Sequence, residues 1–263
     1  LIALGILKHA NIRRYKLESL KALHLQIEAM KLAFRDAQRY IADPSAMEFD
    51  PDNLLNEDYL KERAQLIKER KAIDFRHGIP RGEDTVYLTT ADDDGMMVSY
   101  IQSNFWSFGS GIVIPQTGIA LQNRGNGFTL KENHPNQVAP NKRPYHTIIP
   151  AFVTKENKPL MSFGVMGGHM QPQDHVQMIV RIFDFQQNPQ TAIDAPRWRV
   201  EQGLNVKMEN KFNSDIIKDL RRIGHKIHKT HYFDFGGAQL IYKLKDGYCA
   251  ASDPRKDGQA IGF

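Results

Sequence analysis

Residues 82–95 read Gly-Glu-Asp-Thr-Val-Tyr-Leu-Thr-Thr-Ala-Asp-Asp-Asp-Gly, and this stretch decides how we interpret the chain. From 85 to 91 most residues are β-branched or aromatic, which is typical of a β-strand. Residues 97–103 have the same character, and the acidic turn between the two runs ends in glycine. The pattern predicts a β-hairpin, whose antiparallel pairing would bring Thr85 and Ser103 near each other. Taken alone, a Thr at the start of a strand indicates only β-propensity.

The composition is that of an ordinary soluble globular protein. The 263 residues are 41% hydrophobic and 25% charged, enough to form one large domain or two smaller ones. The net charge of +5 is not gathered in a basic block, so we expect no nucleic-acid partner. The single cysteine, Cys249, excludes an internal disulfide and a cysteine metal cluster. No apolar run is long enough to span a membrane, and no membrane partner is expected.

The first residues indicate that the chain begins inside a longer precursor. They read Leu-Ile-Ala-Leu-Gly-Ile-Leu-Lys, without an initiating Met. The segment also lacks the charged lead and the length of a signal peptide. We therefore expect the true N-terminus to lie outside this sequence, and the protein to be cytoplasmic rather than secreted.

Helical and extended patterns follow one another along the chain. Apolar residues recur at spacings of three and four from Leu20 to Ile41, which predicts an amphipathic helix that ends at Asp43-Pro44. The predicted order is helices, then strands in hairpins, then helices and strands again. This order favours helices layered on antiparallel sheets rather than a βαβ array. Further helices are predicted over 58–71, 172–185, up to 195 and over 213–223, and further strands over 111–114, 118–122, 148–154, 160–165, 238–242 and 248–251.

Two groups of residues carry weaker signals of chemistry. Three histidines, His225, His228 and His231, lie in a basic segment without a carboxylate partner, so we predict solvated side chains and no metal site. Gly167 and Gly168 follow a predicted strand and precede a predicted helix. Two N–H groups at such a junction can hold an oxyanion, although the pair by itself predicts only a tight turn.

Five segments, taken in order, resemble the γ-glutamyltransferase family, which comprises γ-glutamyltranspeptidases and related acylases. The resemblance runs from about residue 29 to the end of the chain. It implies an α+β fold, the four-layer αββα sandwich of N-terminal nucleophile hydrolases, of which only part would be present here. The segments are 82–85 with 92–95, 108–112, 141–144, 166–168 and 251–255.

The resemblance also implies a precursor that cuts itself before a Thr. Thr85 matches that residue, so the cleaved bond would be Asp84–Thr85. Residues 1–84 would then be the mostly helical tail of a large subunit, and 85–263 the small catalytic subunit. The remainder of the large subunit would be a partner and would hold the family's Arg for the substrate carboxylate.

The implied chemistry needs no cofactor. Once freed by cleavage, the α-amino group of Thr85, with an ordinary pKa near 8, would take the proton of its own hydroxyl. Gly167 and Gly168 match the family's oxyanion hole. Ser103 stands where the family has a second Thr that hydrogen-bonds the nucleophile.

Departures from the family pattern concern the substrate. Phe105, Arg124 and Gly127 stand where members that read glutamate carry Asn, Gln and Asp, and His146-Thr147 replaces a Ser-Ser pair. Gly127 cannot pair with an α-ammonium group, whereas Arg124 favours an anion. We therefore expect an amidohydrolase or acylase for small-molecule amides of dicarboxylic acids, such as glutaryl or oxamate compounds, that passes the acyl group to water or an amine.

A second class of function stays open at this point. The chain could belong to an unprocessed homologue that binds a ligand or stabilises a partner without turnover. The oligomeric state is open as well.

Overall fold

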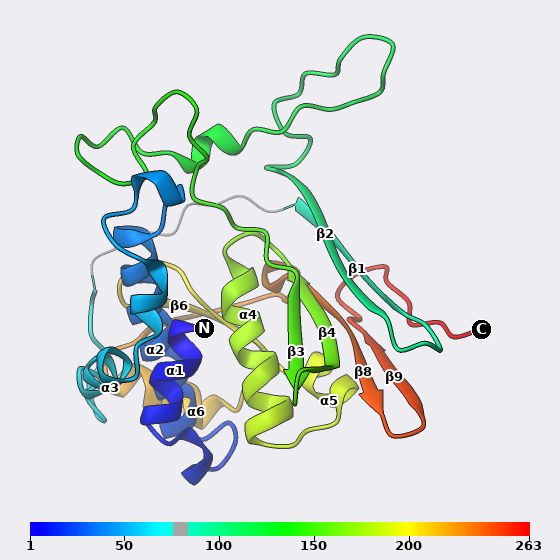
Figure 1. Cartoon of the computed structure of the whole chain (residues 1–263). Helices are drawn as coiled ribbons and strands as arrows, with labels where there is room; N and C mark the ends of the chain where they lie inside the picture. The colour runs from blue at the N-terminus through cyan, green and yellow to red at the C-terminus, as the bar shows by residue number, and fades with distance from the viewer. Residues whose placement is uncertain (76–83) are drawn as a thin grey trace. The chain divides into compact units, whose positions relative to one another are not determined.

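A computed structural model describes residues 1–75 and 84–263 of the chain, without the side chains of Asp84 and Phe233 (Figure 1). The glycines and proline of 74–84 predict a loop before Thr85, and most of this stretch lies outside the described residues. The described chain forms two compact units. The first unit combines 1–75, 124–146 and 198–230, and the second takes the rest. This division follows packing, whereas the predicted boundary before Thr85 concerns a peptide bond.

The first unit is built on α2, Leu20–Tyr40, which confirms the predicted amphipathic helix. Ser19 caps it by accepting a hydrogen bond from the Ala22 N–H at 3.3 Å. The helix stops before Asp43-Pro44, as expected. Its buried residues include Leu23, Ile27, Leu32 and Phe34, so the apolar stripe is a core face.

Two shorter helices, α1 and α3, pack with α2 in the same unit. The sequence analysis did not predict α1, Ile2–His9, which buries Ile6 and Leu7 and contacts both α2 and α3. The helix α3 spans Glu57–Gln65, so the prediction of a helix up to residue 71 was wrong. Beyond Gln65 the chain turns away, and the Ala72 N–H donates to the Ile223 carbonyl at 2.7 Å.

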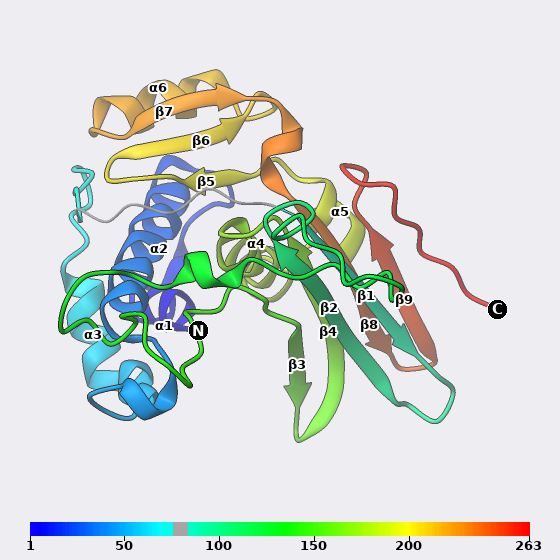
Figure 2. The same ribbon diagram turned by 90° about the horizontal axis from the view of Figure 1, so that it is seen from above.

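A three-stranded sheet completes the first unit. Its strands are β5 (Trp198–Val200), β6 (Asn205–Glu209) and β7 (Lys226–Thr230), in that order. The β5–β6 pair is antiparallel and the β6–β7 pair is parallel, with α6 (Ser214–Arg222) as the crossover. Figure 2 shows the three strands side by side, with α6 next to β7. The sequence predicted the helix α6, which Asn213 caps by accepting from the Asp215 N–H at 2.8 Å, but none of these strands.

The second unit opens with the predicted hairpin. Strands β1 (Asp84–Ala91) and β2 (Met97–Phe105) pair antiparallel, which confirms the prediction. The next two predicted strands were wrong, because residues 111–122 form only an isolated bridge between Val113 and Ala120. The apolar side chains of this segment are exposed, and no sheet pairs with it in the described part of the chain.

Behind the hairpin lies a four-stranded antiparallel sheet in the order β3-β4-β8-β9. All four strands were predicted, with small shifts at their ends. Their bounds are β3 Ala151–Lys155, β4 Lys158–Met166, β8 Gly237–Leu244 and β9 Gly247–Ser252.

Helices cover the other face of this sheet. The predicted helix over 172–185 is α4 (Met170–Ile179) followed by a π-helical turn at Val180–Asp184, and α5 spans Pro189–Asp194. The β4 side chains Met161, Phe163 and Val165 share a core with residues of these helices. Figures 1 and 2 show the resulting layers: hairpin, sheet, helices. The predicted α+β class is confirmed.

Among the described residues, no helix has both the length and the apolarity needed to cross a bilayer.

Candidate active site

Thr85 lies on the inner face of the hairpin. Along β1 the side chains alternate: Thr85 and Thr89 are half-buried and Tyr87 is buried, whereas Val86 and Leu88 are exposed. The β1–β2 register pairs residue 84 with 105 and residue 86 with 102, so a bulge falls at Thr85. The extra residue is on β2, so Ser103 and Asn104 together stand opposite Thr85. That the Thr85 and Ser103 hydroxyls lie near each other stays a prediction. Bulges of this kind redirect a side chain and often lie beside active sites.

The inner face of the hairpin packs on β4, and its contacts run in register. The hydroxyls of Thr89 and Ser162 are hydrogen-bonded. Two residues earlier on β1, the Tyr87 ring covers Gly164, where an added Cβ would lie 2.3 Å from the ring. One further step of two residues on each strand puts Thr85 level with Met166. From this register we expect Thr85 near the end of β4, where Gly167 follows.

Gly167 and Gly168 form the turn between β4 and α4. Their φ angles are +108° and +52°, in the range that glycine adopts at low cost. Their carbonyls accept the first helical hydrogen bonds, from Met170 N–H at 2.8 Å and Gln171 N–H at 3.1 Å. Outside regular elements, none of the backbone hydrogen bonds found among the described residues is donated by the N–H of either glycine. The pair therefore lies outside any sheet or helix ladder.

The chain after Ser103 is strained. Phe105 is buried and has a φ of +82°, unusual for a residue with a side chain. Its N–H donates to the Ser103 hydroxyl oxygen at 2.9 Å, and its ring stacks on Trp106 with centroids 5.6 Å apart. Such backbone strain costs about 1–3 kcal/mol and is found most often at functional sites.

The remaining predicted substrate residues are divided between the units. Arg124 and Gly127 bound a short 3-10 turn in the first unit, which also contains His146, whereas Thr147 belongs to the second unit. Arg124 is buried, and burial lowers the pKa of its guanidinium. His146 is exposed, but partial desolvation, and then the charge of Arg124, lower the pKa of its imidazole. The first unit thus brings together a buried cation and a histidine that favours its neutral form.

Gly127 is tightly packed in that turn. An added Cβ would lie 3.0 Å from the Tyr145 carbonyl oxygen. Asn136 joins the two residues, donating to the Gly127 carbonyl at 2.6 Å and accepting from the Tyr145 N–H at 2.8 Å. The segment before Tyr145 is held in place as well, because the Asp43 carboxylate accepts a hydrogen bond from the Arg143 N–H at 2.9 Å. That hydrogen bond is the main reason why the pKa of Asp43 lies well below its usual range.

A buried charge network that no local sequence pattern indicated lies beneath α4. Arg197 is paired with Asp174 of α4 at 2.9 Å and with Asp253 at 2.6 Å. Asp253 also accepts from the Ala238 N–H at 2.7 Å, and the Arg255 N–H donates to it at 2.9 Å. Burial raises the pKa of Asp253, but the charges of Arg197 and Arg255 and the backbone donors outweigh it and lower the pKa. The network fastens α4, which follows Gly167-Gly168, to β8 and the end of β9.

One predicted surface histidine is not on the surface. His228 and His231 are exposed, as predicted, but His225 is buried. Its Nε2 lies 2.7 Å from His24 Nδ1 and 3.9 Å from a Glu28 carboxylate oxygen. The prediction that His225 is solvated and has no carboxylate partner was therefore wrong. The partners lie on α2, about 200 residues earlier, so no local pattern could reveal them.

A family model described as gamma-glutamyltranspeptidase matches residues 1–263. The chain is 36% identical to the glutathione hydrolase-like YwrD proenzyme of Bacillus subtilis, over all of this chain and 51% of that protein. It is 35% identical to the oxamate amidohydrolase proenzyme of Klebsiella pneumoniae, over 92% of this chain and 47% of that protein.

A solved structure is similar over the entire chain. The cephalosporin acylase from Bacillus halodurans superposes with a TM-score of 0.90 and 45% identity, covering 100% of this chain and 49% of that one. This likeness confirms the predicted fold as part of an N-terminal nucleophile hydrolase sandwich. The chain spans about half the length of the relatives it matches.

Proposed function

The chain belongs to the γ-glutamyltranspeptidase family, and on that premise we propose that it is the nucleophile-bearing part of a self-cleaving amidohydrolase or acylase. The observation that carries the proposal is the position of Thr85. It lies opposite a bulge on the inner face of the hairpin, and the contacts that Thr89 and Tyr87 of that face make with β4 support a position of Thr85 near Gly167. A nucleophile and two backbone donors outside any ladder are the parts that acyl transfer requires.

The first reaction is the processing of the precursor. The Thr85 hydroxyl oxygen attacks the Asp84 carbonyl carbon, the Asp84–Thr85 C–N bond breaks, and an ester forms between residue 84 and the Thr85 side chain. Water then hydrolyses the ester. The products are a carboxylate at Asp84 and a free α-amino group at Thr85. Residues 1–84 become the end of the large subunit and 85–263 the small subunit.

The second reaction is turnover. The free α-amino group of Thr85 takes the hydroxyl proton as Oγ1 attacks the carbonyl carbon of the substrate amide. The N–H groups of Gly167 and Gly168 stabilise the tetrahedral oxyanion, and loss of one such donor typically costs about 3 kcal/mol. The proton then passes to the leaving amine as the C–N bond breaks. Water or another amine releases the acyl group from the ester and regenerates the hydroxyl.

The acyl group is that of a small dicarboxylic acid. Gly127 offers no carboxylate to an α-ammonium group, and the buried Arg124 offers a cation in its vicinity. Because partial desolvation and the charge of Arg124 favour neutral His146, that histidine adds no second charge there. An unpaired ammonium beside a buried guanidinium would meet both a desolvation cost and like-charge repulsion. The name of the Klebsiella relative, an oxamate amidohydrolase, supports this choice, because oxamate is the monoamide of a dicarboxylic acid.

Processing gives the first experiment. The full-length precursor should yield two polypeptides on a denaturing gel, with an intact mass that places the cut between Asp84 and Thr85. Thr85→Ala should leave one band, and Thr85→Ser should restore cleavage. Thr90→Ala is the matched control, because Thr90 lies on the same strand but is exposed. Equal cleavage of wild type and Thr85→Ala would refute the proposal and favour an unprocessed binding protein.

A further inference from the structure

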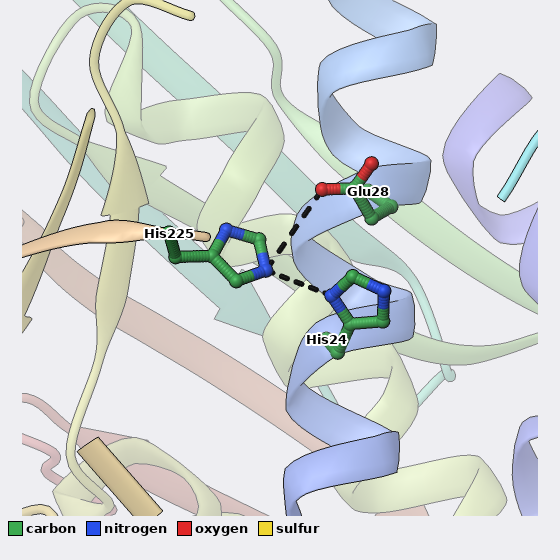
Figure 3. Close-up of side chains that lie close together, drawn as sticks. All are labelled: His24, Glu28 and His225. Atoms are coloured by element: carbon green, nitrogen blue, oxygen red, sulfur yellow. Dashed lines mark hydrogen bonds and ion pairs between the residues drawn. The ribbon is translucent and has the colours of Figure 1, made fainter. Parts of the chain in front are cut away.

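A buried cluster in the first unit takes no part in the proposed reaction. His24 and Glu28 lie one turn apart on α2, and His225 lies between α6 and β7 (Figure 3). All three side chains are buried, with residue exposures of 2% or less. One ligand atom from each falls within 4.8 Å of the others. Two imidazoles and a carboxylate are rarely buried together without a specific role.

The hydrogen bonds fix which nitrogens carry protons. His24 Nε2 lies 2.8 Å from the Lys68 carbonyl oxygen, which can only accept, so Nε2 is protonated. In the neutral ring Nδ1 then carries a lone pair, and this atom lies 2.7 Å from His225 Nε2. His225 Nε2 must therefore be the donor of that bond. His225 Nδ1 is left as a buried acceptor without a hydrogen-bond partner among the described residues.

His24 is arranged as metal-binding histidines are. Such a residue almost always donates its other ring N–H to a carbonyl or a carboxylate, which orients the ring and leaves the ligating lone pair directed at the ion. In His24 the donor is Nε2, the acceptor is the Lys68 carbonyl, and the directed lone pair is that of Nδ1. Figure 3 shows this atom, His225 Nε2 and a Glu28 oxygen directed at one another.

We propose that His24, Glu28 and His225 form a binding site for one divalent transition-metal ion, with zinc as the best match. Two imidazole nitrogens and one carboxylate oxygen are a recurrent zinc ligand set, whereas Mg²⁺ and Ca²⁺ prefer oxygen alone. Bonds of about 2.0–2.1 Å in a tetrahedral site set the ligand atoms about 3.3 Å apart. The 2.7 Å contact must therefore widen and the 3.9 Å contact must shorten, each by about 0.6 Å, and the His24–Glu28 pair, which lies within 4.8 Å, must close by up to about 1.5 Å.

Binding requires two rearrangements. The His225 proton moves from Nε2 to Nδ1, so the ring stays neutral and its Nε2 lone pair is freed for the ion. Glu28 is paired with Lys31 in the metal-free arrangement. Lys31 also donates to the Ile73 carbonyl at 2.8 Å, so it keeps a partner when Glu28 turns toward the ion. Because the cluster is buried, the ion would join α2 to the start of β7 and act as a structural tie.

The experiment uses the full-length protein, stripped with a chelator and titrated with Zn²⁺ by calorimetry, with metal content measured after gel filtration. We expect one ion per chain and a higher Tm. His24→Gln and His225→Gln should each weaken binding at least about 100-fold, the upper range for the loss of an outer-shell partner. The control is His228→Gln, an exposed histidine that should leave binding unchanged. If the histidine variants do not fold, Co²⁺ added to the wild type should give the absorption of a nitrogen-ligated tetrahedral site.

Two outcomes would overturn the proposal. Either the wild type retains no stoichiometric metal and gives no such Co²⁺ spectrum, or the ligand variants bind as the wild type does. The cluster would then be a metal-free pair of hydrogen-bonded histidines. The metal content of Thr85→Ala should equal that of wild type, so this result is independent of the proposed reaction.

Discussion

Replacing Arg124 with Gln should selectively impair the hydrolysis of dicarboxylic monoamides. The proposed contact is a charged hydrogen bond from a buried guanidinium to the distal carboxylate of the acyl group. Hydrogen bonds to charged groups contribute about 1.5–3 kcal/mol. Because about 1.4 kcal/mol is a factor of ten, kcat/KM for a glutaryl anilide should fall about ten- to hundred-fold. The same variant should change kcat/KM for the γ-glutamyl anilide little or raise it, since like-charge repulsion is relieved.

A second substitution makes the prediction sharper. Gly127→Asp on the Arg124→Gln background restores a carboxylate for the α-ammonium group. The Gly127 φ does not lie in the left-handed region, so its backbone accepts Asp, but the new Cβ lies 3.0 Å from the Tyr145 oxygen. The neighbouring loop must therefore move by a few tenths of an ångström. We expect the ratio of the two kcat/KM values to shift toward the γ-glutamyl substrate by about another factor of ten.

The assay is steady-state release of aniline from matched glutaryl and γ-glutamyl anilides by the processed enzyme. Arg222→Gln, which removes an exposed cation of α6, is the control. A wild type that prefers the γ-glutamyl anilide would refute the reasoning. So would a preference that neither substitution moves, because Arg124 and Gly127 would then not read the acyl group.

Two further predictions follow from backbone geometry and burial. Gly167→Ala should lower kcat about a hundredfold by displacing an oxyanion donor. The control for backbone strain is Gly247→Ala, because Gly247 has a similar φ of +126° but lies in open space. Equal activity of the two variants would exclude the role of Gly167. His175 should make the protein less stable in acid. Burial lowers the pKa of its imidazole to about 4, and the hydrogen bond with the Gln171 carbonyl offsets this lowering only in part. The unfolded chain therefore binds one more proton between pH 6.5 and about 4, and the free energy of unfolding falls by up to about 1.4 kcal/mol per pH unit there. Urea unfolding at pH 7, 6 and 5 should show a shallower pH dependence for His175→Gln, and equal slopes would contradict the prediction.

Local sequence determined the elements whose stability is local. The three-and-four spacing from Leu20 to Ile41 specifies α2, because a helix with one apolar face has one way to bury it. The acidic turn ending in Gly95 specifies the hairpin, in which Ser103 and Asn104 stand opposite Thr85. Asn213 marks the start of α6 because its side chain accepts the Asp215 N–H. The order of short motifs identified the family, and with it the roles proposed for Thr85, Gly167 and Gly168.

Tertiary structure decided the elements whose partners lie far away in the chain. The strands β5, β6 and β7 carry charged side chains among the apolar ones, and β6 pairs parallel with β7 only after the crossover through α6. At 111–122 strands were predicted but not formed. The β-branched residues of this segment favour strands, but in the described chain the segment pairs with no sheet. His225 looks like a solvated residue in a basic segment until α2 packs against it and supplies His24 and Glu28. Propensity and capping depend on neighbours within a few residues, whereas burial and charge pairing depend on which distant segments meet in space.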